Sequence, residues 1–149
     1  MEKETRIRKI LREAFAGVPC PEHSSVCGVI PHSVTRELRR DFYNYEPEEI
    51  RYLLPFVLED LMDTRTGDDI ETDDAEFLIM QLDPFLLDNA ITREVKLRQF
   101  ADFTFDQIEA VCEWLSLART WNDLSRFTDY VDRAIQYWCT RSLGSAAES

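Results

Sequence analysis

The stretch NYEPEEIRYLLPFVLEDLMD, residues 44–63, constrains the fold more than any other part of the sequence. Its apolar residues recur at the spacing i, i+3, i+4, i+7, i+8 and i+11, which places them on one stripe of an α-helix. They are Ile50, Leu53, Leu54, Val57, Leu58 and Leu61. Pro47 suits the first turn, and Glu48 follows it where the helix dipole favours negative charge. Pro55 lies inside the stretch, removes one backbone hydrogen bond and is predicted to kink a helix that packs against other helices.

Helical periodicity continues along most of the remaining sequence. Further predicted helices begin near Lys3, Ser33, Asp73, Thr92, Thr104 and Ser125. Thr104 and Gln107 form a T-x-x-Q capping box, which marks a helix start. No run of alternating β-branched residues indicates a strand. The sequence therefore predicts an all-α fold, with about six or seven helices in a single domain over residues 1–142, a Pro-kinked central helix and a frayed tail over residues 143–149.

The chain of 149 residues has a formal net charge of −12, and its acids are unevenly distributed. Residues 59–76 contain nine acids and one base, whereas residues 1–12 carry a net charge of +3. A negative field repels phosphate backbones and attracts basic proteins, so we expect a basic protein partner and no nucleic acid. The predicted partner-binding residues are Asp63, Asp68, Asp69, Glu71, Asp73 and Asp74. The alternative is that these acids only keep the protein soluble.

The sequence also carries expectations about location. No apolar run approaches the ~20 residues of a membrane-spanning helix, so we expect no membrane association. The N-terminal stretch MEKETRIRKILREAF is charged and periodic and lacks the apolar centre of a signal peptide. Four cysteines without an export signal are expected to be free thiols or metal ligands. These features together predict a cytoplasmic protein.

The loop PCPEHSSVCGVIPH, residues 19–32, contains both histidines of the chain. Cys20, His23, Cys27 and His32 are four N/S donors with short spacers, which is the donor set that a tetrahedral structural zinc site uses. The spacing does not begin with the Cys-x₂-Cys of common zinc fingers, and three prolines already stiffen the loop. The alternative is a metal-free loop whose cysteines turn inward as small apolar side chains. We therefore expect no obligatory cofactor, with zinc as the alternative.

Other catalytic and ligand motifs are weak or absent. His23 lies three residues from Cys20, but Gly28 stands alone where a Cys/His hydrolase would have a glycine-rich oxyanion loop. A calcium loop beginning at Asp63 would place Gly67 at the fifth position instead of the sixth. Neither phosphate-binding glycine motif occurs. The sequence therefore does not predict an enzyme.

Three longer stretches occur in the order PEEIRYLLPFVLEDLMD, FTFDQIEAVCEWL and DYVDRAIQYW, after AFAG at residues 14–17. Together they resemble a bacterial family of small, acidic, helical proteins labelled only as a domain of unknown function. The resemblance rests on the step Leu54-Pro55-Phe56, the spacing from Phe103 to Gln107, and the pair Tyr137-Trp138. It extends from about Leu11 to Trp138. It implies a helical fold and a bacterial source, and it brings no known activity and no catalytic residues.

Most aromatic residues fall on apolar helix faces and are predicted to lie in the core, while Tyr43 and Trp121 lie at segment ends and are predicted to be more exposed. Exposed aromatic residues beside acids are typical of protein interfaces. The interpretation is a protein-binding module, for example an immunity protein or a toxin inhibitor, that neutralises a basic partner. Two alternatives remain open: a zinc-stabilised regulator using residues 20–32, and a structural subunit of a homo-oligomer.

Overall fold

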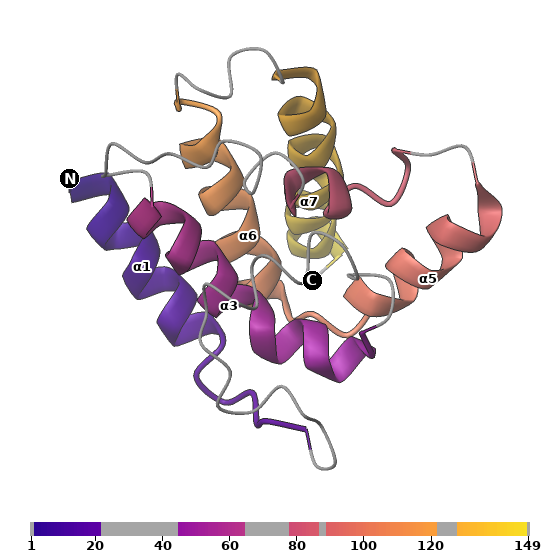
Figure 1. The fold of residues 1–149 in the computed structure, drawn as a ribbon, viewed down its shortest axis with the longest axis horizontal. Coiled ribbons are helices and arrows are strands. Elements are labelled where there is room, and N and C mark those ends of the chain that lie inside the picture. The colour runs from indigo at the N-terminus through magenta and orange to yellow at the C-terminus, as the bar shows by residue number, and fades with distance from the viewer. Residues whose placement is uncertain (1, 22–44, 65–77, 87–88, 122–127, 149) are drawn as a thin grey trace.

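The computed structural model describes residues 2–21, 45–64, 78–86, 89–121 and 128–148, and every regular element in these ranges is helical (Figure 1). The helices are α1 (Glu2–Ala14), α3 (Pro47–Thr64), α5 (Ala90–Phe100), α6 (Phe105–Ala118) and α7 (Thr128–Glu148). A further helical turn covers residues 78–81. The predicted all-α, single-domain fold is confirmed. The helix starts predicted near Ser33, Asp73 and Ser125 lie outside the described residues.

Helix α6 is the central element of the described structure. It packs along α7 and along α1, while α3 packs against α1 and α5 (Figure 1). The core between these helices is built from apolar side chains that are almost completely buried, including Leu11, Leu54, Leu58, Phe100 and Val111. The stripe predicted on α3 therefore faces the core, as its spacing indicated.

Capping side chains determine where α5 and α6 begin. At α6, Thr104 Oγ1 accepts a hydrogen bond from the Gln107 backbone N–H (3.2 Å), and Gln107 Oε1 accepts one from the Thr104 N–H (3.0 Å). The predicted capping box is confirmed. Helix α5 begins two residues before its predicted start, because Asn89 Oδ1 accepts from the N–H groups of both Ile91 and Thr92 (3.0 and 3.1 Å).

Two helices continue through segments where the sequence predicted a disturbance. Helix α3 is continuous through Pro55, and a bend at that residue stays a prediction. The backbone of α7 is helical as far as Glu148, and fraying of the tail over 143–149 stays a prediction.

Two buried tryptophans connect distant parts of the chain by hydrogen bonds as well as by packing. Trp114 on α6 donates its indole N–H to the Leu58 carbonyl on α3, and Trp138 on α7 donates to the Leu82 carbonyl, both at 3.0 Å. Both rings are fully buried. Trp121, predicted to be exposed, is half-buried because its ring packs edge-on against Trp114 at 5.6 Å. Tyr43 lies outside the described residues.

Replacing Trp114 by phenylalanine should lower the free energy of unfolding by about 2 kcal/mol, because the smaller ring leaves a void and the Leu58 carbonyl loses a donor. Urea unfolding measures the change. Trp121→Phe, at a half-buried position, should cost less than half as much. Equal losses in the two variants would show that the α6–α3 hydrogen bond contributes nothing specific.

A disulfide bond joins α6 to α7. The bonded residues are Cys112 and Cys139, whose Cα atoms are 5.1 Å apart. Cys20 is also disulfide-bonded. The expectation of free or metal-bound thiols is therefore wrong for these three cysteines. No partner for Cys112 was predicted from the sequence, and the side-by-side packing of α6 and α7 brings it to Cys139.

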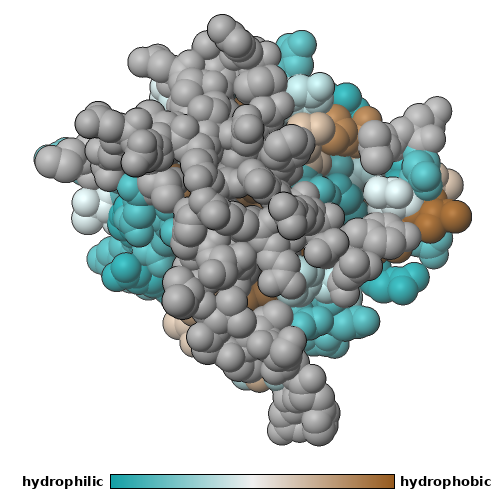
Figure 2. All heavy atoms as spheres, viewed as in Figure 1, coloured by the Kyte–Doolittle hydropathy of each residue, from teal (hydrophilic) through white to brown (hydrophobic). Residues whose placement is uncertain are grey.

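The described surface is mostly hydrophilic in the view of Figure 2, with apolar atoms gathered toward the side where α5 and α7 lie. Large apolar side chains with substantial exposure are Phe56, Phe85, Ile91, Leu97 and Phe105. None of the described helices has the combination of length and apolar character that crossing a bilayer requires.

Candidate functional site

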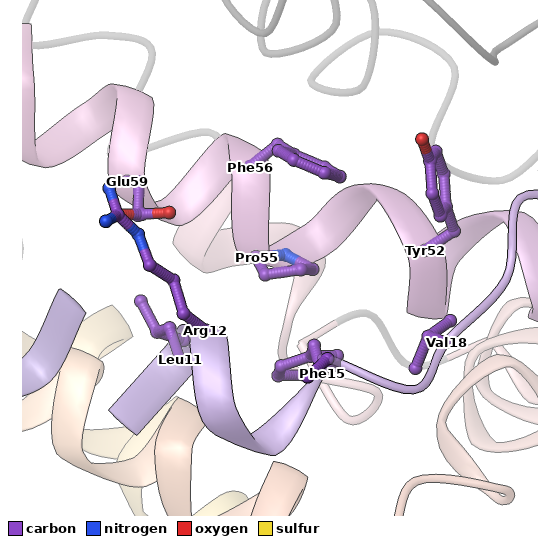
Figure 3. Close-up of a pocket in the computed structure, with 9 residues that line it drawn as sticks. Leu11, Arg12, Phe15, Val18, Tyr52, Pro55, Phe56 and Glu59 are labelled. Atoms are coloured by element: carbon purple, nitrogen blue, oxygen red, sulfur yellow. The ribbon is translucent and has the colours of Figure 1, made fainter. Parts of the chain in front are cut away.

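An apolar groove lies between α1 and α3, with a cavity of about 230 Å³ (Figure 3). Its floor is formed by Leu11 and Phe15 from the α1 segment and by Pro55 from α3, all three of them buried. The rim is aromatic. Tyr52 and Phe56 lie one helical turn apart on α3 with ring centroids 5.4 Å apart, and 43% of Phe56 is exposed. The groove therefore combines a buried apolar floor with an exposed aromatic wall.

The groove residues of α3 lie on a different face from the core stripe. At about 100° per residue, positions 52, 55, 56 and 59 fall on the side of the helix opposite Ile50, Leu54 and Leu61. The first three positions of that opposite side are apolar, Tyr52, Pro55 and Phe56. The C-terminal turn of α1 packs against this second apolar face. Only the first stripe was used to predict this helix. The second apolar patch on the same helix is the sequence signal that indicates the groove.

One end of the groove is closed by charged residues. Arg12 reaches from α1 to Glu59 on α3, with Nη2 3.0 Å from Glu59 Oε1, and Val18 lies with Tyr52 at the other end (Figure 3). Arg8 extends the contact, since its guanidinium lies 3.8 Å from Glu59 and 2.6 Å from Asp63. These pairs are partly exposed, so each contributes little to stability. They do fix the position of α1 along α3.

These ion pairs explain the uneven charge of the sequence. The basic segment at residues 1–12 lies against acids of other elements: Arg8 and Arg12 contact α3, and Arg6 pairs with Glu113 on α6 at 3.2 Å. The bases of this segment therefore pair with acids of the same chain. They neutralise the beginning of the acidic segment at residues 59–76.

The predicted partner-binding acids divide into two groups. Asp63 is described; it lies in the last turn of α3 at an exposed position and accepts a hydrogen bond from Arg8 at 2.6 Å. Asp68, Asp69, Glu71, Asp73 and Asp74 lie outside the described residues. The structure therefore gives Asp63 a partner within the chain, and the role of all six acids toward a second protein stays a prediction.

The predicted zinc ligands are likewise only partly described. Cys20 is disulfide-bonded, and a disulfide sulfur has no thiolate to offer a metal. His23, Cys27 and His32 lie outside the described residues. Within the described ranges, no cluster of three or more His, Cys, Asp or Glu side chains has the arrangement of a metal site. Cys20 cannot be a zinc ligand and a disulfide partner at the same time. The predicted four-ligand zinc site therefore requires this disulfide to be absent.

A buried polar cluster was not found by sequence reasoning. Lys96 on α5 is only 5% exposed and donates to Gln81 Oε1 at 2.9 Å. Burial lowers its pKa from 10.5 to about 8, and the nearby Asp83 carboxylate opposes part of that shift. Asp83 is itself buried and lies 3.3 Å from Arg133 Nε. In the sequence, Lys96 looks like any lysine of a helix surface, so no signal indicated its burial.

The groove between α1 and α3 has the size and chemistry of a binding site for a side chain. Its volume is below the roughly 300–1,000 Å³ typical of small-molecule pockets. The charged residues among its described lining, Arg12 and Glu59, are paired with each other. Its described lining residues do not bring a nucleophile and a base together. No protein-family model, no curated protein and no solved structure matches the chain.

Proposed function

We propose that this protein is a binding module for a basic protein partner and that the groove between α1 and α3 receives an apolar side chain of that partner. The observation that carries the proposal is the exposed wall of the groove. Phe56 belongs to the face of α3 that points away from the main core, and it is 43% exposed beside a buried apolar floor. An aromatic residue at the edge of an apolar pocket is the arrangement typical of interface hot spots.

The volume of the groove supports a protein partner over a cofactor. A cavity of about 230 Å³ accommodates one or two apolar side chains, and the paired Arg12 and Glu59 close one end without leaving an unpaired charge in the wall. An anchor from a partner would bury Phe56 and the floor together. This desolvated centre would supply most of the affinity, as in other protein interfaces.

The charge of the chain supports a basic partner. A net charge of −12 creates a long-range field that accelerates the encounter with a positively charged surface. In this proposal the acids Asp63, Asp68, Asp69, Glu71, Asp73 and Asp74 contact the basic surface, and the groove holds the apolar anchor. Covering a basic active surface is how an immunity protein or an inhibitor acts. The proposed function is therefore neutralisation by binding, without catalysis by this chain.

Replacing Phe56 by serine should weaken binding of the basic partner by about tenfold or more, because the exposed half of the ring is lost from the centre of the interface. The test immobilises the protein, captures binders from a lysate of the source cells and identifies them by mass spectrometry. Affinities are then measured with the purified binder at low and at physiological salt. A binder of high isoelectric point, weakened by salt and by Phe56→Ser, supports the proposal.

The matched control is Phe105→Ser, which truncates an equally exposed phenylalanine, 41% exposed, at the start of α6. It should leave the affinity within about twofold, as expected outside an interface centre. Asn substitutions at 68, 69, 73 and 74 should reduce the association rate and its salt dependence. If both Ser variants bind alike, the groove is not the interface. If light scattering finds instead that Phe56→Ser dissolves a dimer, the occupant is a second copy of this chain.

A further inference from the structure

A second groove, of about 560 Å³, lies along α7 and differs in chemistry from the first. One wall is a face of α7 with the spacing i, i+3, i+4, i+7 and i+8, formed by Arg133, Gln136, Tyr137, Thr140 and Arg141. The other wall is the segment that follows the helical turn at 78–81 and contributes Asp83 and Phe85. The spacing makes this face of α7 a continuous row of polar and aromatic side chains about 12 Å long.

Two hydrogen bonds and one ion pair join the two walls. Trp138 donates to the Leu82 carbonyl at 3.0 Å, and Arg133 Nη2 donates to the Phe85 carbonyl at 2.7 Å. Asp83, 3% exposed, accepts the Phe85 N–H on Oδ1 at 2.9 Å and places Oδ2 3.3 Å from Arg133 Nε. The groove is therefore preformed, because its walls do not need a ligand to bring them together.

Positive charge gathers at this groove, although the chain as a whole carries −12. Arg133 and Arg141 lie two turns apart in its wall, and the one acid among its described lining residues is Asp83. Arg141 is held in place, since Nη1 donates to the Tyr137 hydroxyl at 3.0 Å and Nη2 to the Phe100 carbonyl at 3.2 Å. A guanidinium has five N–H donors, so these contacts leave donors at both arginines for an anion.

Two aromatic rings, those of Phe85 and Tyr137, also line this groove. Phe85 is 47% exposed, and its ring centroid lies 6.1 Å from that of Tyr137. The Arg93 guanidinium lies over the Phe85 ring at 5.3 Å, and the Arg141 guanidinium lies over Tyr137 at 5.2 Å. Flat guanidinium and ring surfaces of this kind stack on planar groups.

We propose that this groove binds a small organic anion that carries a planar aromatic ring. The anionic group binds Arg133, and the ring packs against Phe85 and Tyr137. The volume lies within the roughly 300–1,000 Å³ typical of small-molecule sites, in contrast to the groove between α1 and α3. The shared chemistry, a ring joined to an anion, is met by an aryl phosphate, such as phenyl phosphate, and by an aromatic carboxylate, such as benzoate.

Isothermal titration calorimetry with four probes tests this site in the intact chain. Phenyl phosphate and benzoate carry both features, inorganic phosphate carries only the anion, and phenol at neutral pH carries only the ring. The better of the two joined probes should bind at least about tenfold more tightly than either half alone. Whether phenyl phosphate or benzoate binds more tightly identifies the class of anion.

Two variants locate the site. Arg133→Gln should weaken the better joined probe by at least about tenfold, and Arg133→Lys should recover only part of that loss because a lysine cannot form the two-pronged contact. Arg98→Gln, on the exposed face of α5, is the control with the same charge change and should have no effect. Amide chemical shifts of the wild-type protein keep the test valid if a variant fails to fold. Probe-induced shifts at Phe85, Gln136 and Thr140 support the proposal, and shifts confined to α1 or absent altogether overturn it.

Discussion

Replacing Cys112 and Cys139 together by serine should lower the free energy of unfolding by about 3–4 kcal/mol. The disulfide connects positions 27 residues apart in sequence, and opening a loop of that length returns this much conformational entropy to the unfolded chain. It also releases α6 from α7, the most extensive helix pair of the described structure. Urea unfolding without reductant measures the loss, and the wild-type protein in reductant should lose at least as much.

Reductant added to the double variant provides the control. Because Cys20 is also disulfide-bonded, any further loss of stability in this sample belongs to that second bond. Unfolding curves of the double variant and of the oxidised wild-type protein that coincide would show that the bond between α6 and α7 does not contribute. Disulfides persist in oxidising compartments, whereas the cytoplasm keeps thiols reduced. Thiol trapping in the source cells therefore also tests the cytoplasmic location that the sequence predicts.

Local chemistry made parts of this fold predictable. The capping box of Thr104 and Gln107 involves residues three apart, so sequence alone placed the start of α6 correctly. The stripe from Ile50 to Leu61 likewise predicted α3 and its buried face. The predicted start of α5 at Thr92 was two residues late, because the Asn89 side chain caps the helix and this cap was not predicted. Apart from the Asn89 cap, features set by neighbours in sequence were predicted, and features set by neighbours in space were not.

The groove between α1 and α3 shows why the candidate site was harder to predict. Phe15 and Phe56 are 41 positions apart, and nothing local to either one indicates that they line the same cavity. The sequence did separate a basic start from an acidic segment, but their pairing through Arg8 and Asp63 needed the fold. In the proposed function, the groove receives an apolar side chain of the partner, and the acids at 68–74 contact the partner's basic surface.

The difference in free energy of unfolding between the Lys96→Met variant and the wild-type protein should change by about 2–3 kcal/mol between pH 7 and pH 10. Burial lowers the pKa of Lys96 from 10.5 to about 8, and Asp83 only partly offsets this. Below pH 8 the amine is charged in both the folded and the unfolded chain, so the folded state carries the full cost of burying the charge. As pH rises from 8 to 10.5 the folded state loses the proton first, and the wild-type protein gains stability.

The methionine variant should therefore be the more stable protein at pH 7 and should lose that advantage as the pH approaches 10, where the missing hydrogen bond to Gln81 costs about 1 kcal/mol. Burial raises the pKa of Tyr137, with Arg141 opposing the shift, so Tyr137 costs stability above pH 10 in both proteins and cancels in the comparison. Lys3→Met, at an exposed position, is the control for removing a lysine charge. Urea unfolding at pH 7, 8, 9 and 10 provides the four differences. If the Lys96→Met difference is constant over that range, Lys96 keeps an ordinary pKa in the folded protein, and the polar cluster around Asp83 is open to water.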